Sequence, residues 1–449
     1  MLSPLKMSPA IFLCISLLSL SIFPSTPQAT VPPSARFSFT NEGDFGDYIV
    51  EYNANYRVLS IATTPFQLCF YNTTPGQYTL ALRMGTVRSE ALMRWVWEAN
   101  RGNPVGENAT FSLGANGNLV LAHSDGRIAW QSNTADKGVV EFELLNNGNM
   151  VLKDSKGRFV WQSFDSPTDT LLVGQSLRIG SPSKLISRTS PEENKNGEYS
   201  LVLEPRDLAM YFTGAKSRTP YRYFSFLAAN RLFLPNNTTL INTTFNANLG
   251  FDTQVTNDGA GGGGTFLKNP RFNTTLSYLR LEIDGNLRVH TFIISTDSDG
   301  FQTQLWEIAV TIFSEDDLWA LETKCQLPGR CGEFGVCEDS QCVGCPSPNG
   351  LAGWSRDCKA PKLNDCGGKK KSDFKYFELK GVDHFVAKYT RGDAPVKQQS
   401  CADKCSKDCK CLGYFYHSDA SRCWIAYELK TMTRVANSTH LAFIKAPLL

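Results

Sequence analysis

Residues 113–132 read LGANGNLVLAHSDGRIAWQS and residues 144–163 read LLNNGNMVLKDSKGRFVWQS, so one pattern occurs twice in close succession. Each copy has an Asn-Gly-Asn turn, a short apolar run, a Gly-Arg turn and a second run that ends in Trp-Gln-Ser. Two short runs joined by a glycine-containing turn are typical of a β-hairpin. A single hairpin cannot bury its own apolar face, so neighbouring copies must stack and share a core. Trp130 and Trp161, near the ends of the copies, are predicted to fill that core.

Four segments give this region a family resemblance: WEANR at residues 97–101, NGNLVL at 116–121, WQSNT at 130–134 and WQSFDSPTDTLL at 161–172. They resemble the bulb-type, mannose-binding lectin domain of plants, and the last motif is long and rarely found elsewhere. The resemblance implies a β-prism of three four-stranded sheets around a pseudo-threefold axis, here over residues 37–172. It also implies mannose sites on strands of the form Gln-x-Asp-x-Asn-x-Val-x-Tyr, whose polar side chains alternate onto one strand face.

Both clear copies depart from that sugar-binding pattern. Its five positions hold Gly114, Asn116, Asn118, Val120 and Ala122 in the first copy, and Leu145, Asn147, Asn149, Val151 and Lys153 in the second. Gln and Tyr are lost from both copies. Neutral Asn also replaces Asp, which weakens the contact at that position because hydrogen bonds to charged groups are roughly twice as strong as neutral ones. Each lost sugar contact costs on the order of 1–3 kcal/mol. Asn-Gly turns that serve only the scaffold are therefore favoured, but any sugar site that persists is expected on these faces.

A second β-rich region follows, from about residue 177 to 311. Its segment SYLRLEIDGNLRVHTF, residues 277–292, resembles the strand pair of a second, divergent lectin-like domain, as in the plant S-locus glycoprotein family. The sugar-pattern positions there hold Glu282, Asp284, Asn286, Arg288 and His290. Asp284 and Asn286 keep the Asp and Asn of the pattern and are candidate sugar contacts, but an Asp-Gly-Asn turn is also selected for its backbone geometry alone.

The N-terminal residues 1–29 are typical of a secretory signal peptide. Lys6 supplies the positive charge, residues 10–23 are apolar but too short to span a bilayer, and cleavage is expected after Ala29. We expect no later membrane span, and therefore a secreted protein of the extracellular space or plant cell wall. Asn-x-Ser/Thr sequons, each a candidate for glycosylation, agree with that destination: Asn72, Asn108, Asn236, Asn237, Asn242, Asn273 and Asn437.

Charge is nearly balanced along the chain. With 45 basic and 43 acidic residues, the formal net charge is +2. This balance argues against a dedicated nucleic-acid or anionic-membrane protein. The run Lys369–Lys371 offers a contact for acidic polysaccharide, but a solvated linker is the favoured interpretation.

Cysteines divide the chain in two. Cys14 lies in the signal segment and Cys69 lies among aromatic residues, where a buried free thiol is predicted. All the others lie between Cys325 and Cys423. Because the protein is expected to be secreted, disulfides are favoured over the zinc site that such spacing also permits. The C-terminal quarter is therefore expected to depend on disulfides and the β-rich part on its hydrophobic core.

Two resemblances cover the cysteine-rich part. Residues 325–358, which begin CQLPGRCGEFGVC, resemble the EGF-like module of the S-locus family. Residues 366–447, with the run CADKCSKDCKC and the later Cys-Trp pair, resemble a PAN/apple domain, and residues 400–408 are predicted to form a helix. The resemblances imply six disulfides: Cys325–Cys337, Cys331–Cys342, Cys345–Cys358, Cys401–Cys423, Cys405–Cys411 and, less directly, Cys366–Cys409.

The expected fold is all-β, with two β-prism, bulb-lectin-like domains, followed by a disulfide-rich EGF-like module and an α+β PAN/apple domain. This order resembles the extracellular half of plant S-domain receptor kinases without the membrane span and kinase. FYNTTP at residues 70–75 and YTLALRMG at 78–85 are similar to the soluble family of epidermis-specific secreted glycoproteins of plants.

No enzyme is expected. The five histidines are scattered without metal-ligand spacing, and no Gly-x-Ser-x-Gly motif is present. Glu282 and Asp284 share a strand face, but nothing else supports glycoside hydrolysis. We therefore expect no catalytic residue, metal or cofactor.

Two binding functions stay open. One is a carbohydrate-binding protein of the cell wall that recognises mannose-type glycans with degenerate lectin strands. The other is a protein-binding or scaffolding glycoprotein, with a role in cell-to-cell signalling, whose lectin fold has lost its sugar sites. PAN and EGF-like modules usually mediate protein contacts, which favours the second function, whereas only the fold resemblance favours the first.

Overall fold

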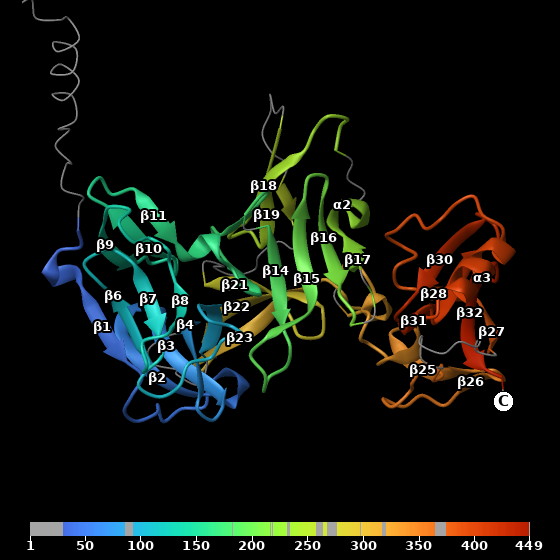
Figure 1. The fold of residues 1–449 in the computed structure, drawn as a ribbon, viewed down its shortest axis with the longest axis horizontal. Coiled ribbons are helices and arrows are strands. Elements are labelled where there is room, and N and C mark those ends of the chain that lie inside the picture. The colour runs from blue at the N-terminus through green and yellow to red at the C-terminus, as the bar shows by residue number, and fades with distance from the viewer. Residues whose placement is uncertain are drawn as a thin grey trace, which may run out of the picture.

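A computed structural model describes residues 30–85, 93–181, 183–215, 217, 219–230, 234–256, 264–266, 276–296, 298–316, 320–363 and 374–448. The signal segment 1–29, the sequon Asn273, Cys366 and the run Lys369–Lys371 lie outside these residues. Strands dominate, and the sheets follow one another along the long axis of the molecule from the N-terminal to the C-terminal part (Figure 1).

Three antiparallel sheets form the N-terminal unit. The first has the order β1 (Phe37–Thr40), β6 (Thr110–Leu113), β7 (Leu119–Ala122) and β8 (Ile128–Gln131). The second has the order β2 (Asn55–Thr63), β3 (Phe66–Thr74), β4 (Gln77–Met84) and β5 (Arg94–Glu98). The third has only three strands in place of the expected four: β11 (Phe159–Gln162), β10 (Met150–Asp154) and β9 (Val139–Leu144).

One tryptophan from each of these sheets meets the other two where the sheets converge. Trp97 of β5, Trp130 of β8 and Trp161 of β11 have ring centroids 5.7–6.4 Å apart in edge-to-face arrangements. Edge-to-face pairs are favoured because the positive ring edge faces the negative ring face. All three rings pack in the core of this unit, so the repeated Trp closes the three sheets on one another.

The middle unit also has three sheets, and each of these has four strands. One is β12 (Thr170–Leu172), β21 (Ser277–Leu281), β22 (Leu287–Thr296) and β23 (Gln302–Thr311). The second is β13 (Ser176–Arg178), β18 (Leu240–Phe245), β19 (Gly250–Val255) and β20 (Gly264–Phe266). The third is β14 (Lys184–Arg188), β15 (Asn196–Glu204), β16 (Asp207–Phe212) and β17 (Tyr221–Ser225), followed by the one-turn helix α2 (Phe226–Ala229).

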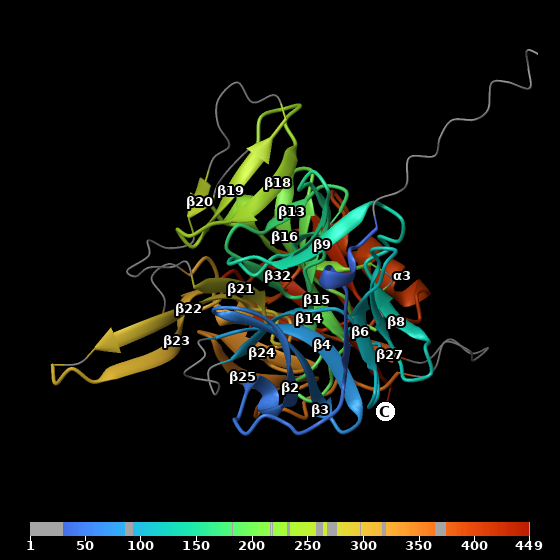
Figure 2. The ribbon, with the colours of Figure 1, turned by 90° about the vertical axis from the view of Figure 1, so that its left-hand side faces the viewer.

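Two features of the middle unit were not expected. Strand β12, which the sequence analysis placed at the end of the first domain, pairs with β21 of the middle unit. The β22–β23 hairpin extends beyond the body of the molecule (Figure 2).

Two sheets form the C-terminal part. One has the order β26 (Gly350–Ala352), β25 (Gln341–Ser347), β24 (Phe334–Glu338), β31 (Lys430–Arg434) and β28 (Val382–His384). The other has the order β27 (Phe374–Lys380), β32 (His440–Pro447), β29 (Gly413–His417) and β30 (Arg422–Ala426). Because β24 and β31 pair in parallel, the cysteine-rich segment and the chain that follows it share one sheet.

Helix α3 (Gln398–Lys407) packs against β29 and β30 and carries two buried cysteines on one face. Short 3₁₀ turns occupy Pro33–Ala35, Glu51–Asn53, Ser163–Asp165 and Lys324–Gln326. The described residues form these disulfides, each of them a pair that the resemblances implied: Cys325–Cys337, Cys331–Cys342, Cys345–Cys358, Cys401–Cys423 and Cys405–Cys411. The other implied pair, Cys366–Cys409, includes a residue outside the described part of the chain. The Cys69 thiol is buried in β3.

Candidate functional site

Asn118, at the start of β7, uses its side chain to hold neighbouring chain in place. The side-chain carbonyl accepts hydrogen bonds from the Thr134 backbone N–H at 3.0 Å and from the Ser132 hydroxyl at 3.2 Å. Its amide nitrogen donates to Gln131 Oε1 at 2.8 Å, and only 7% of the residue is exposed. The amide therefore fastens β7 to the segment that follows β8.

The second repeat copies this arrangement. Asn149 accepts from the Phe164 backbone N–H at 3.2 Å and from the Ser163 hydroxyl at 3.3 Å, and donates to Gln162 Oε1 at 2.8 Å. In the middle unit, Asn286 makes a reciprocal pair of bonds with the backbone of Phe313, at 3.0 and 3.2 Å. All three asparagines are buried, so each of these candidate sugar contacts serves the fold.

The exposed members of the three patterns cap the turns. Asn116, Asn147 and Asp284 each accept a hydrogen bond from the backbone N–H two residues further on, at 2.9–3.1 Å. This is the Asx-turn geometry that selects Asn and Asp at such positions. Of the two valines in the pattern, Val120 is half-buried and Val151 is fully buried.

Ion pairs occupy other positions of the pattern. Lys153, where the pattern has Tyr, pairs with Glu143, and Asp284 pairs with Arg288 at 2.7 Å. His290 Nε2 lies 2.7 Å from Glu282 Oε1. These polar groups are therefore engaged with one another on the face that a sugar would need.

A third copy of the pattern, which the sequence analysis missed, lies in β4. Ala81 pairs with Glu98 as Val120 pairs with Gln131 in the first sheet. Counted in this register, the polar positions fall on Gln77 and Thr79 of β4 and the tyrosine position on Arg83. This copy is equivalent to the other two in position but not in residue type, since none of these residues matches the pattern. In the sequence it could be found only by counting positions back from Trp97 in WEANR.

Chain from the middle unit covers this third face. Asn194 Nδ2 donates to Thr79 Oγ1 at 2.8 Å, and Arg188 Nη1 donates to the Tyr71 hydroxyl at 2.7 Å. The Arg188 guanidinium also lies 3.6 Å from Glu98, and only 1% of the residue is exposed. The face that would bind sugar in the β2–β5 sheet is therefore an interface between the two units.

Buried charges continue from this interface to a cleft, whose lining includes Glu98 and Arg101. Arg101 pairs with Glu98 at 2.5 Å and with Asp169 at 2.7 Å. Burial of Asp169 disfavours its charged form, but nearby Arg101 and Arg280 outweigh burial and lower the pKa of this carboxyl. Burial, reinforced by Glu98, raises the pKa of the Tyr71 hydroxyl well above its ordinary value, so the phenol stays neutral.

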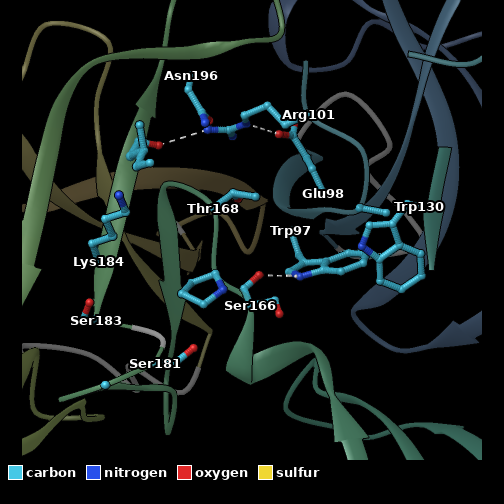
Figure 3. Close-up of a pocket in the computed structure, with 14 residues that line it drawn as sticks. Trp97, Glu98, Arg101, Trp130, Ser166, Thr168, Ser181, Ser183, Lys184 and Asn196 are labelled. Carbon is cyan, nitrogen blue, oxygen red and sulfur yellow. Dashed lines mark hydrogen bonds and ion pairs between the residues drawn. The ribbon is translucent and has the colours of Figure 1, made fainter. Parts of the chain in front are cut away.

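The cleft itself has a volume of about 430 Å³ and lies between the N-terminal and middle units (Figure 3). Trp97 and Trp130 line one side, and Ser181, Ser183 and Lys184 line the other. Trp97 Nε1 donates to the Ser166 carbonyl at 2.9 Å, which fixes the indole at the edge of the cleft. The hydroxyl of Thr168, also in the lining, is buried with no hydrogen-bond partner among the described residues. Aromatic walls with a few convergent polar groups are typical of small-molecule binding sites.

Comparison with known proteins gives the chain its family. Residues 94–192, which include most of the cleft lining, match the family described as D-mannose binding lectin. The chain is 47% identical to EP1-like glycoprotein 3 of Arabidopsis thaliana, and the match covers 99% of this chain and 98% of that protein. The chain belongs to the EP1-like glycoprotein family.

Other relatives of this EP1-like chain extend the comparison. It is 52% identical to the epidermis-specific secreted glycoprotein EP1 of Daucus carota, over 78% of this chain and 92% of that one. It is 27% identical to the G-type lectin S-receptor-like serine/threonine-protein kinase SD2-5 of Arabidopsis thaliana, over 74% of this chain and 37% of the kinase. A solved two-domain, fetuin-binding lectin of Scilla campanulata matches 60% of this chain and 96% of its own, at 15% identity. The TM-score of this match is 0.15.

Among the described residues, no helix is both long enough and apolar enough to cross a membrane.

Proposed function

We propose that this EP1-like glycoprotein is secreted to the plant cell wall or apoplast and binds glycans there through its lectin-type sheets. The cleft beside Trp97 and Trp130 carries this proposal, because it combines aromatic edges with polar side chains that face open space. Sugar rings present both apolar C–H faces and hydroxyl groups, and a cleft of this composition can satisfy both. The names of the relatives, a secreted glycoprotein and a G-type lectin S-receptor-like kinase, agree with a secreted, lectin-type protein.

The cleft is a better candidate for the main contact than the strand asparagines. The side-chain amides of the strand asparagines already form hydrogen bonds within the fold. Removing Asn118, Asn149 or Asn286 would leave buried backbone N–H or C=O groups without partners. By contrast, Thr168 holds a hydroxyl that a ligand hydroxyl can pair with after a small movement of the lining. The exposed Asn116, Asn147 and Asp284 remain candidate secondary contacts for a branched glycan.

Binding of a single sugar is expected to be weak. Several weak contacts on one branched or repeating glycan gain through effective concentration, so retention should be appreciable only on such glycans. No catalytic residue and no cofactor form part of the proposal.

A glycan array or a column of immobilised wall polysaccharide tests the proposal. Thr168→Val removes the unpartnered hydroxyl at nearly constant shape, and Lys184→Glu reverses the charge on the opposite wall; each is expected to reduce retention at least about tenfold. Lys156→Glu is the matched control, because Lys156 is exposed on a turn away from the cleft. Retention that is equal for all four proteins would rule out the cleft.

For the C-terminal part, we propose that residues 325–358 are an EGF-like module and residues 366–447 a PAN/apple domain. The observed disulfides, the α3 helix and the two sheets support this assignment. The shared β24–β31 pairing implies that the two segments act as one body.

A second candidate function, protein binding in cell-to-cell signalling, is favoured by the β22–β23 hairpin. This projecting hairpin carries three exposed large apolar side chains, Ile294, Phe301 and Ile308, which are 51–69% exposed (Figure 2). Exposed apolar groups of this kind mark protein-interaction surfaces when they cluster.

Retention of the protein on a cell-wall fraction, treated beforehand with either a glycosidase or a protease, distinguishes the two functions. If glycosidase treatment of the fraction abolishes retention and protease treatment does not, glycan binding holds. The reverse result supports protein binding, and Phe301→Ser should then weaken retention.

A further inference from the structure

Asp383, His417 and His440 form a side-chain cluster far along the chain from the cleft. His417 ends β29 and His440 begins β32, and the two residues are directly opposite each other in the antiparallel ladder. Asp383 is the middle residue of β28, which pairs with β31 in the neighbouring sheet and packs against β32. The cluster therefore bridges the two C-terminal sheets.

The geometry of the cluster is compact. His417 Nε2 lies 2.6 Å from one oxygen of Asp383, and His440 Nδ1 lies 2.7 Å from the other. The two imidazole rings are nearly parallel, with centroids 3.5 Å apart. The three side chains are 13–19% exposed, so the site is sheltered but reachable from solvent.

We propose that Asp383, His417 and His440 bind a divalent transition-metal ion, with Zn²⁺ as the ion to test first. Two imidazole nitrogens and one carboxylate oxygen form a donor set that suits Zn²⁺, Cu²⁺ and Ni²⁺ and does not suit Mg²⁺ or Ca²⁺. The candidate ligand atoms all lie within 4.8 Å of one another. With zinc bonds of about 2.1 Å, tetrahedral ligands lie about 3.4 Å apart, so small side-chain rotations are enough to admit the ion.

A metal also explains why two imidazoles converge on one carboxylate. In the present arrangement each ring points one nitrogen at Asp383. A metal ion binds an imidazole nitrogen that carries no proton, so each ligating ring takes the tautomer with its proton on the other nitrogen. Three protein ligands leave a fourth position for water, as in open metal sites.

Neighbouring residues hold the ligands in place. Trp424 packs on the His417 ring with centroids 4.5 Å apart, and Trp424 Nε1 donates to Thr390 Oγ1 at 3.0 Å. The strand ladder fixes the His417 backbone on both sides and pairs His440 with His417. The site is therefore largely preformed, and metal binding would link the sheet that carries the cysteine-rich segment to the C-terminal sheet.

No metal site is expected from the sequence, because the histidines are scattered along the chain. The antiparallel ladder, however, makes cross-strand neighbours of histidines that are distant in sequence. His290 offers a useful contrast. It lies 2.7 Å from Glu282 and stacks on Tyr278, but the pair has no second imidazole.

The test uses the full secreted chain, treated with a chelator and then dialysed. Isothermal titration with ZnCl₂ is expected to show one ion bound per chain, with a Kd in the micromolar range or below. Because an ion that binds only the folded state stabilises it, excess Zn²⁺ should raise the Tm measured by calorimetry. His417→Gln and His440→Gln should each weaken Zn²⁺ binding at least about tenfold and remove the Tm shift.

His290→Gln is the matched control and should bind Zn²⁺ as the unchanged chain does. Asp383→Asn keeps the side-chain shape and removes the charged ligand, so it should also weaken Zn²⁺ binding. Circular dichroism without metal should be the same for all the variants, which guards against a folding defect. Failure of the unchanged chain to bind Zn²⁺, Cu²⁺ and Ni²⁺ overturns the proposal, as does equal binding by His417→Gln, His440→Gln and the unchanged chain. In either case the cluster is a hydrogen-bonded trio only.

Discussion

At the scale of single residues, one side-chain amide can serve either a ligand or the fold, and the sequence letter is the same in both cases. Asn118 and Asn149 occupy positions where a sugar contact was expected, yet each satisfies a backbone N–H and a hydroxyl that would otherwise be buried without a partner. An unsatisfied buried donor costs about 1–3 kcal/mol, more than the bond itself contributes. The fold therefore restrains these residues whether or not a glycan binds.

Asn118→Ala is accordingly expected to lower the free energy of unfolding by about 2 kcal/mol, because it leaves the Thr134 N–H without an acceptor. Asn116→Ala is the control. Asn116 is exposed and makes one turn-capping bond, so its loss should cost about 1 kcal/mol or less. Urea unfolding followed by tryptophan fluorescence measures both. Equal midpoints for Asn118→Ala and the unchanged chain would contradict the structural role.

His384 predicts a pH dependence of stability. The ring is buried, Nε2 lies 2.9 Å from the Glu428 carbonyl, and burial lowers the pKa of His384 to about 4. In the unfolded chain the pKa is about 6.5, so between these values only the unfolded state takes up the proton. The stability contributed by neutral His384 is therefore fully present above pH 6.5 and decreases as the pH falls towards 4, by up to about 3 kcal/mol.

The variant His384→Phe isolates this contribution. Phe fits among the aromatic neighbours of His384, Phe385 and Phe415, but cannot titrate. Unfolding of the two proteins at pH 7 and pH 5 should show a smaller loss of stability for the variant. If both proteins lose stability equally between these pH values, His384 is not the responsible group.

At the scale of elements, the turns of the repeat show how local chemistry and packing combine. Gly148 and Gly157 both have positive φ, +84° and +75°, in the two turns that flank β10. A Cβ on Gly148 would lie 2.7 Å from both Leu172 and Phe66, whereas a Cβ on Gly157 would meet nothing within 4 Å. The first turn is therefore packed against another sheet and the second faces solvent.

Alanine substitution separates the two effects. Gly157→Ala should cost about 1 kcal/mol, from backbone strain alone. Gly148→Ala should cost a further 1–3 kcal/mol, approximately, because the added methyl overpacks the contact with Leu172 and Phe66. Thermal unfolding of the two variants measures the difference. A Gly148→Ala protein as stable as Gly157→Ala would show that Leu172 and Phe66 move aside for the added methyl without loss of stability.

The sequence predicted these elements where their signals are local. The hairpins followed from the repeated Asn-Gly-Asn and Trp-Gln-Ser segments, and α3 followed from cysteines spaced four residues apart. The copy in β4 was not predicted because Thr79 and Arg83 differ from the residue types of the pattern, and only the strand register identifies their positions. The cover over that face, the parallel β24–β31 pairing and the Asp383 cluster are contacts between segments distant in sequence, which no local pattern encodes.

At the scale of the whole molecule, the units are linked through buried polar contacts and a shared core. Arg188 and Asn194 join the middle unit to the N-terminal one. Gln326 donates hydrogen bonds to the carbonyls of Tyr223 and Phe385, and so links the middle unit to both parts of the C-terminal region. One hydrophobic cluster also runs from the middle unit into the C-terminal sheets. Loss of structure at the C-terminal end should therefore affect the middle unit before the N-terminal one.

Reduction of the disulfides tests this order. Each bridge contributes about 2–4 kcal/mol, so loss of the bridges formed by the described residues removes stability comparable to the whole of the roughly 5–15 kcal/mol that stabilises a domain. After treatment with a reductant, limited proteolysis read by mass spectrometry should cut residues 325–423 first and the middle unit next. The N-terminal sheets should resist longest, because their core around Trp97, Trp130 and Trp161 includes no disulfide among its described residues. The same digestion without reductant is the control. Equal protection of the N-terminal and C-terminal parts after reduction would show that packing alone stabilises the C-terminal sheets.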